Sequence, residues 1–456
     1  MRKLLCLLFL TICGHAFATA HFVRSGATGS GTGADWTNAW TTLSGINWGS
    51  VSAGDTIYVA AGTYTGQLNW GASGTSGNPV TLEAVESTDT AATGAAGWSS
   101  AYIGPVTQTH TTGTDCIYIN NMSGYIVIDG RTWENWKLDS TGITAGAGVE
   151  IDGSAPTNVT LRYLWAYGPG TVTQSGDCRG FDLTPTSGTM SNLTVQYCES
   201  GNGGDANMYL TLADNALVEH CSLHDANAVN NTTYHQNAIY CGKITNSTIR
   251  YNAIYDTYVE GIFFGDPSNS ADLIYDNLFY QGTIGAQTGA AAINFDNASS
   301  GNSGILIYNN TFVDLVIGIQ FDTTHTESYS GCKFENNIVY NCGVNVDSTG
   351  WTSDYNAFSG TTSETHSIGS IANTFTSYTA YTTYVLTLAS STAPIGAALN
   401  LGSPYNVDYA GTIRPASGAW DIGAYEYAGV PATPGTLSCV GYSTPATPGT
   451  LTTVHQ

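Results

Sequence analysis

The chain has 456 residues, of which 34 are acidic and 11 are basic, and its formal net charge is −23. A surface with this charge repels polyanions, so nucleic-acid binding is not expected. Only 10% of the residues are charged and 54 are glycines, a composition typical of short β-strands separated by many turns rather than of helices.

The N-terminus has the layout of a secretory signal peptide. Arg2 and Lys3 precede an apolar run over residues 4–13, and small residues follow within residues 16–20. We therefore expect residues 1–20 to be removed and the mature protein to be secreted or held at the cell surface, in an extracellular or periplasmic space. No later apolar run approaches the length that spans a membrane.

Two features are expected at the start of the mature chain. Residues 35–43 predict a short helix with Asp35 as its N-cap, which would close the end of a β-core with the apolar side chains of Trp36, Trp40 and Leu43. Residues 54–64 and 77–84 are rich in strand-forming residues and bounded by turn residues, which predicts two strands.

A short pattern recurs six times in the middle of the chain: an apolar residue, two variable residues, and then an Asn or Cys. Successive copies are 23 to 33 residues apart, close to the length of one coil of a solenoid. One such unit is too small to bury its own apolar side chains, so the units must stack, about 4.8 Å apart. A stacked column of Asn side chains can form a hydrogen-bonded ladder. The fourth positions are Cys198, Cys221, Asn252, Asn277, Asn310 and Asn337.

Eight cysteines remain after the leader, without a spacing typical of a metal site. Cys198 and Cys221 occupy equivalent positions in adjacent coils, where they can stack as buried thiols or form a disulfide. In an oxidising compartment some cysteines should pair, and Cys332 with Cys342 is a candidate local bridge.

The phrases at residues 54–64 and 77–84, with a following coil at residues 125–130, resemble the opening of secreted right-handed parallel β-helix proteins of the pectate-lyase-like superfamily. The Asn-bearing coils resemble the repeat of the same superfamily. The resemblance implies an all-β chain that forms a right-handed parallel β-helix over residues 21–360, with the short N-terminal helix as a cap.

The end of the chain is expected to differ from the coils. Residues 361–428 should hold the last coils and a capping segment, because residues 408–415 and 420–426 resemble a closing segment of exported bacterial β-helix proteins. Residues 429–456 contain the phrase Pro-Ala-Thr-Pro-Gly-Thr-Leu twice, which predicts a Pro/Thr/Gly-rich linker or tail.

A second strand can be aligned across the coils, and alternate side chains along it point inward and outward. Its outward column is Asp182, Tyr209, Tyr240, Phe263, Asn294 and Gln320. The three aromatic residues can bind sugar rings, or they can stack only to stabilise the sheet. With an Asn just upstream, the predicted substrate-binding residues are Asn207, Tyr209, Tyr240, Phe263 and Asn294.

Charged residues flank this column. Cleavage of a polysaccharide needs two carboxylates for hydrolysis, or a base with charge neutralisation for elimination. The candidate catalytic residues are therefore Arg179, Asp182, His235 and Glu260. Asp296 and Asp322 occupy equivalent positions in neighbouring coils, which makes them candidate calcium ligands.

A further outward column contains Arg162, Glu219 and Arg250. Lys243 and Arg250 lie seven residues apart and could be taken for a catalytic pair. We instead expect Arg250 to form a salt bridge with Glu219 across adjacent coils.

The resemblance to β-helix lyases implies a Lys or Arg base beside calcium held by clustered Asp residues. After the leader the chain has only three Lys and six Arg and no Asp-Asp pair, and it lacks the motif set of the β-helix polygalacturonases. Two hypotheses follow. The protein binds an extracellular polysaccharide and cleaves it as a lyase or hydrolase, or it is a non-catalytic, surface-attached structural or adhesive protein. The oligomeric state is left open.

Overall fold

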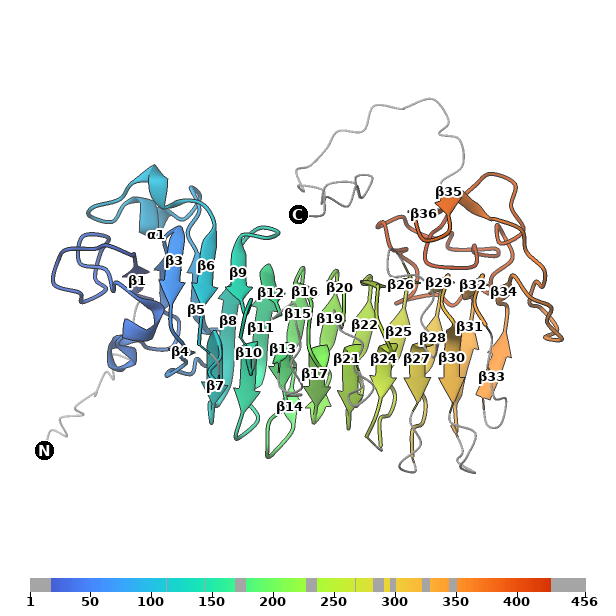
Figure 1. The fold of residues 1–456 in the computed structure, drawn as a ribbon, viewed down its shortest axis with the longest axis horizontal. Coiled ribbons are helices and arrows are strands. Elements are labelled where there is room, and N and C mark those ends of the chain that lie inside the picture. Colours follow the sequence, from blue (N-terminus) through green and yellow to red (C-terminus); the bar gives the residue numbers. More distant parts are fainter. Residues whose placement is uncertain are drawn as a thin grey trace, which may run out of the picture.

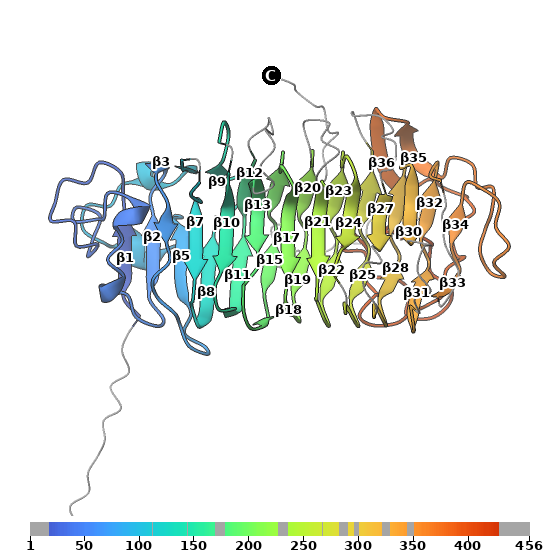
Figure 2. The ribbon, with the colours of Figure 1, turned by 60° about the horizontal axis from the view of Figure 1, so that its bottom comes forward.

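The computed structural model describes residues 18–427, except for residues 112, 144, 169–177, 227–235, 267, 282–290, 296–300, 322–328 and 344–350. The described chain forms a long parallel β-helix built from three parallel sheets, called sheets A, B and C (Figure 1, Figure 2). The predicted β-helix is confirmed. The helices are short and lie towards the N-terminal end: η1 (Leu43–Gly45), η2 (Trp48–Ser50), α1 (Thr90–Thr93) and η3 (Ser100–Tyr102).

Sheet A has 12 strands, in the order β1 (Ala20–Val23), β2 (Thr56–Val59), β5 (Val80–Ala84), β8 (Gly124–Asp129), β11 (Thr157–Arg162), β15 (Thr194–Gln196), β19 (Leu217–Glu219), β22 (Thr248–Arg250), β25 (Leu273–Tyr275), β28 (Leu306–Tyr308), β31 (Cys332–Glu335) and β33 (Trp351–Asp354). Sheet B has 11 strands, in the order β3 (Gly62–Thr65), β6 (Val106–Thr109), β9 (Trp136–Asp139), β12 (Leu164–Tyr167), β16 (Glu199–Gly201), β20 (Ser222–His224), β23 (Ala253–Tyr255), β26 (Leu278–Tyr280), β29 (Thr311–Val313), β32 (Ile338–Tyr340) and β34 (Ala357–Phe358).

Sheet C has 9 strands, β4 (Leu68–Asn69), β7 (Ile117–Asn120), β10 (Gly146–Asp152), β13 (Cys178–Leu183), β17 (Ala206–Thr211), β21 (Asn237–Gly242), β24 (Glu260–Phe264), β27 (Ala291–Phe295) and β30 (Ile317–Phe321). Two small sheets pair β14 (Met190–Ser191) with β18 (Ala213–Asp214), and β35 (Phe375–Thr379) with β36 (Thr383–Leu388).

Each central coil contributes one strand to sheet A, then one to sheet B, then one to sheet C, as β11, β12 and β13 do. Every strand pairs in parallel with the equivalent strand of the next coil, so equivalent side chains form columns along the helix. The inward column of sheet C is fully buried and apolar: Val149, Phe181, Met208, Ile239, Ile262 and Ile293. This column places the intervening residues of sheet C on its outer face.

The predicted Asn ladder is confirmed. Each Asn donates from Nδ2 to Oδ1 of the Asn in the next coil at 3.0 to 3.2 Å, along Asn252, Asn277, Asn310, Asn337 and Asn356. All of these side chains are fully buried. At the start of the ladder the backbone N–H of Cys221 donates to Asn252 Oδ1 at 2.9 Å. The ladder therefore satisfies amides that would be costly to bury alone.

The described cysteine side chains are free thiols: Cys116, Cys198, Cys221, Cys241, Cys332 and Cys342. Cys198 and Cys221 thus follow the first of the two predicted arrangements and stack as buried thiols. The predicted bridge between Cys332 and Cys342 is wrong. Cys332 Sγ accepts from the N–H of Ile305 before β28, whereas Cys342 Sγ accepts from the N–H of Leu315 after β29, both at 3.4 Å. Cys332 thus lies at the start of β31 and Cys342 lies after β32, at opposite ends of these two consecutive strands.

The helix predicted for residues 35–43 is wrong: residues 35–42 are mostly bends, Trp40 forms a β-bridge with Val23, and only Leu43 begins a short helical turn, η1. Asp35 Oδ1 accepts from the N–H of Asn38 at 2.8 Å, as an N-cap would, but no helical turn follows. Trp36 instead donates from Nε1 to the carbonyl of Ala92 at 2.8 Å, which ties it to α1. The predicted burial is confirmed for Trp36, Trp40 and Leu43.

The C-terminal segment, residues 395–427, folds back along the side of the β-helix, beside the strands of its last coils (Figure 1). The Tyr251 hydroxyl donates to the carbonyl of Val407 at 3.3 Å, and the N–H of Ala424 donates to Thr311 Oγ1 at 3.0 Å. These contacts brace several coils from one side. Among the described residues, no helix has both the length and the apolar character needed to cross a membrane.

Candidate functional site

The outer face of sheet C carries the column that the strand alignment predicted. Backbone pairing places Asp182 beside Tyr209, Tyr209 beside Tyr240, Tyr240 beside Phe263, and Phe263 beside Asn294. The same column continues towards the N-terminus, where Glu150 pairs with Asp182. The column therefore contains an acidic residue, Glu150, that the sequence analysis missed.

Arg179 is the central cation of this face. Its Nη1 donates to Asp182 Oδ2 at 2.6 Å and its Nη2 donates to Asp205 Oδ2 at 2.9 Å. The guanidinium also lies 4.1 Å from the ring centroid of Tyr209. Burial alone would lower the pKa of Arg179, but the charges of Asp182 and Asp205 outweigh it and raise that pKa. Arg179 thus stays protonated and cannot serve as a base.

The predicted aromatic residues stack on one another. The rings of Tyr209 and Tyr240 are nearly parallel, with centroids 3.9 Å apart, and Phe263 meets Tyr240 edge-on at 5.6 Å. Tyr209 therefore has Arg179 on one face and Tyr240 on the other. A sugar on this sheet would meet the ring edges and hydroxyl groups of the two tyrosines rather than a flat aromatic surface.

Glu150 is the most strongly perturbed acid of this face. Burial raises its pKa to about 8, with further contributions from the charge and hydrogen bond of Asp115 and from the charges of Asp182 and Asp152. Asp115 precedes β7, on the side of β10 away from Asp182. The raised pKa favours the protonated form of the Glu150 carboxyl group, which can donate a proton.

Asp182 lies on the strand next to Glu150 and is held in place by two donors. Besides Arg179, the hydroxyl of Thr184 donates to Asp182 Oδ1 at 2.7 Å. Adjacent parallel strands are about 4.8 Å apart. The face thus has a carboxyl group with a raised pKa beside an arginine-bound carboxyl group, a pair that can act as a general acid and as a base or nucleophile.

Glu260 is not brought together with Arg179 and Asp182. It begins β24, three strands from β13, a separation of about 14 Å. Its Oε1 accepts from Asn294 Nδ2 at 3.1 Å, so these two predicted site residues contact each other instead.

Both polar atoms of the Asn207 side chain form hydrogen bonds with backbone groups. Its Oδ1 accepts from the N–H of Gly203 at 2.9 Å, and its Nδ2 donates to the carbonyl of His224 at 2.7 Å. Asn207 is also fully buried. The contacts favour a role in holding the turn before β17 rather than in binding a ligand.

Three predicted site residues, His235, Asp296 and Asp322, lie outside the described residues. Within the described part of the chain, no three His, Cys, Asp or Glu side chains converge closely enough to hold a metal ion. Calcium binding therefore remains a prediction.

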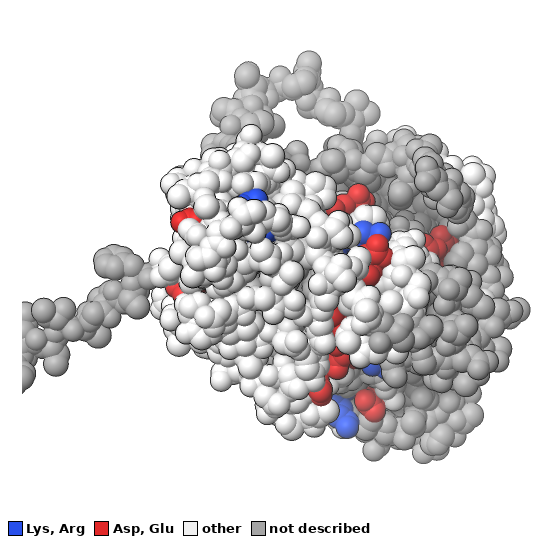
Figure 3. Space-filling view, turned by 60° about the vertical axis from the view of Figure 1, so that its left-hand side comes forward, with Lys and Arg blue, Asp and Glu red and all other residues white. Residues whose placement is uncertain are grey.

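Most of the other basic residues have a structural role. Arg250 forms the predicted salt bridge with Glu219, at 2.6 Å, and Arg162 contacts Asp129 at 2.7 Å in the same column of sheet A. Figure 3 shows that charged side chains on one side of the molecule gather in a strip, while most of the described surface around it is uncharged. The strip is mainly acidic.

No protein-family model matches the sequence, and no curated protein matches it either. Among solved structures, that of the pectate lyase Pel9A is similar with a TM-score of 0.51 and 14% sequence identity, over 90% of this chain and 98% of that one. A lacto-N-biosidase of family GH136 from Eubacterium ramulus gives a TM-score of 0.46 and 12% identity, over 75% of this chain and 67% of that one. At this identity the first comparison establishes the fold alone: the chain has the parallel β-helix fold of a pectate lyase structure.

Proposed function

We propose that the protein is exported, binds an extracellular polysaccharide along the outer face of sheet C, and hydrolyses it at Glu150 and Asp182. The observation that carries the proposal is the pairing of β10 with β13, through which Glu150, whose pKa is raised by burial, lies beside the arginine-bound Asp182. The secretory layout of residues 1–20 supports an extracellular substrate.

In this proposal the two carboxyl groups have separate roles. Glu150 donates its proton to the leaving glycosidic oxygen, and Asp182 acts on the other side of the sugar as nucleophile or as base for water. Arg179 and Thr184 orient the Asp182 carboxylate. One product gains the proton, the other gains the hydroxyl group of water, and a new reducing end forms.

The protonated state of Arg179 favours hydrolysis over elimination. A lyase needs a base that removes a proton from the sugar, and Arg179 is bound to two carboxylates that keep it protonated. A neutral polysaccharide is favoured over a polyanionic one, since the formal net charge is −23.

The test is incubation of the mature protein with a panel of neutral and acidic polysaccharides, with and without calcium. We expect new reducing ends on a neutral polysaccharide and no absorbance from unsaturated uronates. Glu150→Gln and Asp182→Asn should each lower the rate by about 100-fold or more, whereas Glu134→Gln, at an exposed position, should not.

Two other outcomes would change the proposed function. Unsaturated products would replace hydrolysis with elimination. Binding without any cleavage across the panel would favour the alternative of a non-catalytic, surface-attached structural or adhesive protein.

A further inference from the structure

Aromatic and charged side chains gather on the outer face of sheet B, over the four consecutive strands β9, β12, β16 and β20. We call them the sheet B cluster: Lys137, Trp165, Tyr167, Glu199 and His224. Backbone pairing places Lys137 beside Trp165, and Trp165 beside Glu199. The intervening residues of these strands point inward and are fully buried: Leu138, Ala166, Ser200 and Leu223. The cluster therefore lies on a different sheet from Glu150 and Asp182.

The aromatic part of the cluster holds a cation. The rings of Trp165 and Tyr167 meet edge-on, with centroids 5.8 Å apart. Lys137 Nζ lies 5.3 Å from the centroid of Trp165 and 5.2 Å from that of Tyr167. It also contacts Asp139 at 3.0 Å. An ammonium group has three N–H donors, and all three cluster side chains are half-buried, so donors remain for a ligand beside the rings.

The charged part of the cluster fixes a carboxylate beside Trp165. His224 Nε2 lies 3.0 Å from Glu199 Oε1, and His224 Nδ1 lies 2.7 Å from Asp225 Oδ2. Burial alone would lower the pKa of His224, but its hydrogen bonds with the two carboxylates raise that pKa to about 9. Both ring nitrogens therefore donate. Glu199 Oε1 is thus held in place, while Oε2 has no hydrogen-bond partner among the described residues.

Gly201 leaves room between Tyr167 and His224. These three residues occupy one column, on β12, β16 and β20. Further along this column, His224, Tyr255 and Tyr280 stack with successive ring centroids 4.9 Å apart. Gly201 interrupts the column, and a Cβ at this position would lie 2.8 Å from His224 Cε1. Because two strand spacings, about 9.6 Å, separate the positions of Tyr167 and His224, the column lacks one ring beside Tyr167.

We propose that the sheet B cluster binds a sugar residue of a neutral polysaccharide. The C–H groups of a pyranose pack against aromatic rings, here those of Trp165 and Tyr167. Its hydroxyl groups can donate to Glu199 Oε2 and accept from Lys137 Nζ. The carboxylates around the cluster outnumber the cations, with Asp139, Glu199 and Asp225 against Lys137 and His224. A neutral ligand is therefore favoured over an anionic one.

This inference goes beyond the proposed function, because binding on sheet B requires no hydrolysis. In the chain, β9 directly precedes β10, which carries Glu150, and β12 directly precedes β13, which carries Asp182. A polysaccharide held on sheet B thus stays close to sheet C, which raises its effective concentration at the proposed catalytic residues.

The test is an NMR titration of the full chain with cellohexaose, xylohexaose and mannohexaose, and with hexagalacturonate as the anionic comparison. The signal to follow is the indole N–H of Trp165, assigned from the signal lost in Trp165→Phe. We expect it to shift with a neutral hexasaccharide and not with hexagalacturonate. The indole N–H of Trp98 should not shift, because Trp98 packs on Trp36 and Tyr102 far from the cluster. A Trp165 signal that no neutral hexasaccharide shifts would overturn the inference, and so would a shift with hexagalacturonate alone.

Variants separate this site from the proposed catalytic face. Glu199→Gln should weaken the binding seen at Trp165 by about 10-fold or more, whereas Glu134→Gln, at an exposed position, should not. Equal affinities in these two variants would overturn the site. The titration of the unsubstituted protein decides the question even where a variant folds poorly.

Asp182→Asn, on sheet C, should abolish hydrolysis and leave the Trp165 shift unchanged. Hydrolysis in a protein whose Trp165 signal no sugar shifts would refute the sheet B site alone. A Trp165 shift in a protein that cleaves nothing would support the sheet B site and refute the proposed hydrolysis alone.

Discussion

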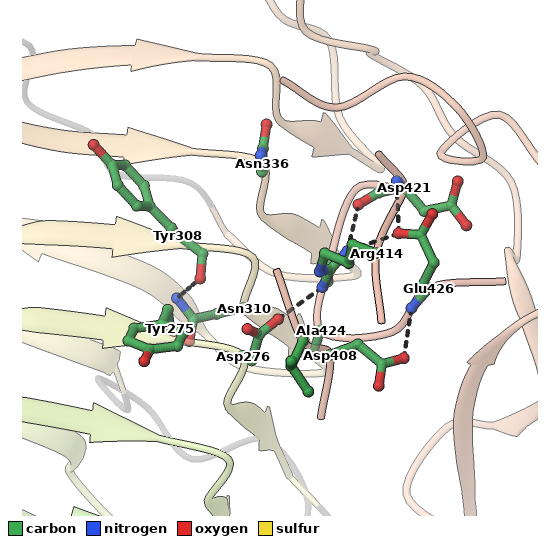
Figure 4. A network of polar contacts seen from close by, with 12 residues as sticks. Tyr275, Asp276, Tyr308, Asn310, Asn336, Asp408, Arg414, Asp421, Ala424 and Glu426 are labelled. Atoms are coloured by element: carbon green, nitrogen blue, oxygen red, sulfur yellow. Dashed lines mark hydrogen bonds and ion pairs between the residues drawn. The ribbon is translucent and has the colours of Figure 1, made fainter. Parts of the chain in front are cut away.

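The guanidinium of Arg414 donates to the carboxylate of Asp276 at 2.7 Å, although 138 positions separate the two residues and both side chains are fully buried (Figure 4). Arg414 also donates to Glu426 Oε2 at 3.0 Å and to the carbonyl of Gly423 at 2.9 Å. Asp276 belongs to the turn after β25, and Arg414 to the C-terminal segment. One buried cation therefore fastens that segment to the side of the β-helix.

Replacing Arg414 by Met should destabilise the protein strongly. The substitution keeps most of the volume but leaves the Asp276 carboxyl group buried without its partner, which typically costs about 3–5 kcal/mol. The free energy of unfolding in urea measures the loss. Lys137→Met is the control, since Lys137 and its partner Asp139 are 28% and 22% exposed and the loss of this pair should cost about 1 kcal/mol or less. Equal losses for the two variants would contradict the assigned role of Arg414.

Substitution of an Asn in the ladder should destabilise the protein. Asn277→Ala removes the acceptor of Asn252 Nδ2 at 3.0 Å and the donors to the carbonyl of Ile249 and to Asn310. Each buried group left without a partner costs about 1–3 kcal/mol, so the total loss should be about 3 kcal/mol or more. Urea unfolding measures it.

The exposed Asn192 provides the control for the ladder. Its Nδ2 donates to Asn158 Oδ1 at 3.1 Å in an exposed Asn column. Its φ of 58° makes glycine the appropriate substitute. Asn192→Gly should change stability by less than about 0.5 kcal/mol. A similar loss in both variants would show that burial does not govern the strength of the ladder.

The sequence was sufficient to predict those features that repeat from coil to coil. Alternation along short strands placed Tyr209, Tyr240 and Phe263 in one outward column, and the spacing of the Asn pattern predicted their ladder. The bridge between Glu219 and Arg250 followed from the same periodicity. Such features depend only on which residues occupy equivalent positions in adjacent coils.

Features that depend on distant segments were not predictable in this way. Trp36 donates to the carbonyl of Ala92 in α1, and Arg414 contacts Asp276 from 138 positions along the chain. Glu150 was missed because its coil precedes the aligned strands and lacks the Asn pattern. A signal existed: Val149 and Ile151 flank Glu150 with the same alternation as Phe181 and Leu183 flank Asp182, and extending the alignment by one coil would have found it.

The hydroxyl group of Tyr240, rather than its ring face, should contact a bound polysaccharide. The ring stacks on Tyr209 at 3.9 Å and meets Phe263 edge-on. A bound sugar can therefore contact the edge and the hydroxyl group of Tyr240. Tyr240→Phe keeps the stack and removes one hydrogen-bonding group, which should weaken binding by roughly 5- to 10-fold without changing the melting temperature. Isothermal titration with the best polysaccharide of the panel measures it. Unchanged affinity in Tyr240→Phe together with lost affinity in Tyr240→Leu would assign the contact to the ring instead.

The stability of the β-helix should fall as the pH rises, partly because of Asp272. Its Oδ1 accepts from the N–H of Ser247 at 2.9 Å, while its Oδ2 is buried without a hydrogen-bond partner among the described residues. Burial raises the pKa of Asp272 to about 8 from an ordinary 3.8. The folded state therefore keeps the proton over a range in which the unfolded state has released it.

The sign of the pH dependence follows from this proton. The contribution of Asp272 to stability is fully present below about pH 4 and is lost as the pH rises through about 8, at about 1.4 kcal/mol per pH unit within that window. Asp272→Asn supplies the same acceptor to Ser247 with no group to ionise. Compared with the unsubstituted protein, it should gain stability steadily between pH 5 and pH 8, as measured by urea unfolding, while Glu134→Gln should not. Parallel pH profiles for Asp272→Asn and the unsubstituted protein would show that Asp272 is already ionised in the folded protein, with a group outside the described residues or water compensating its buried charge.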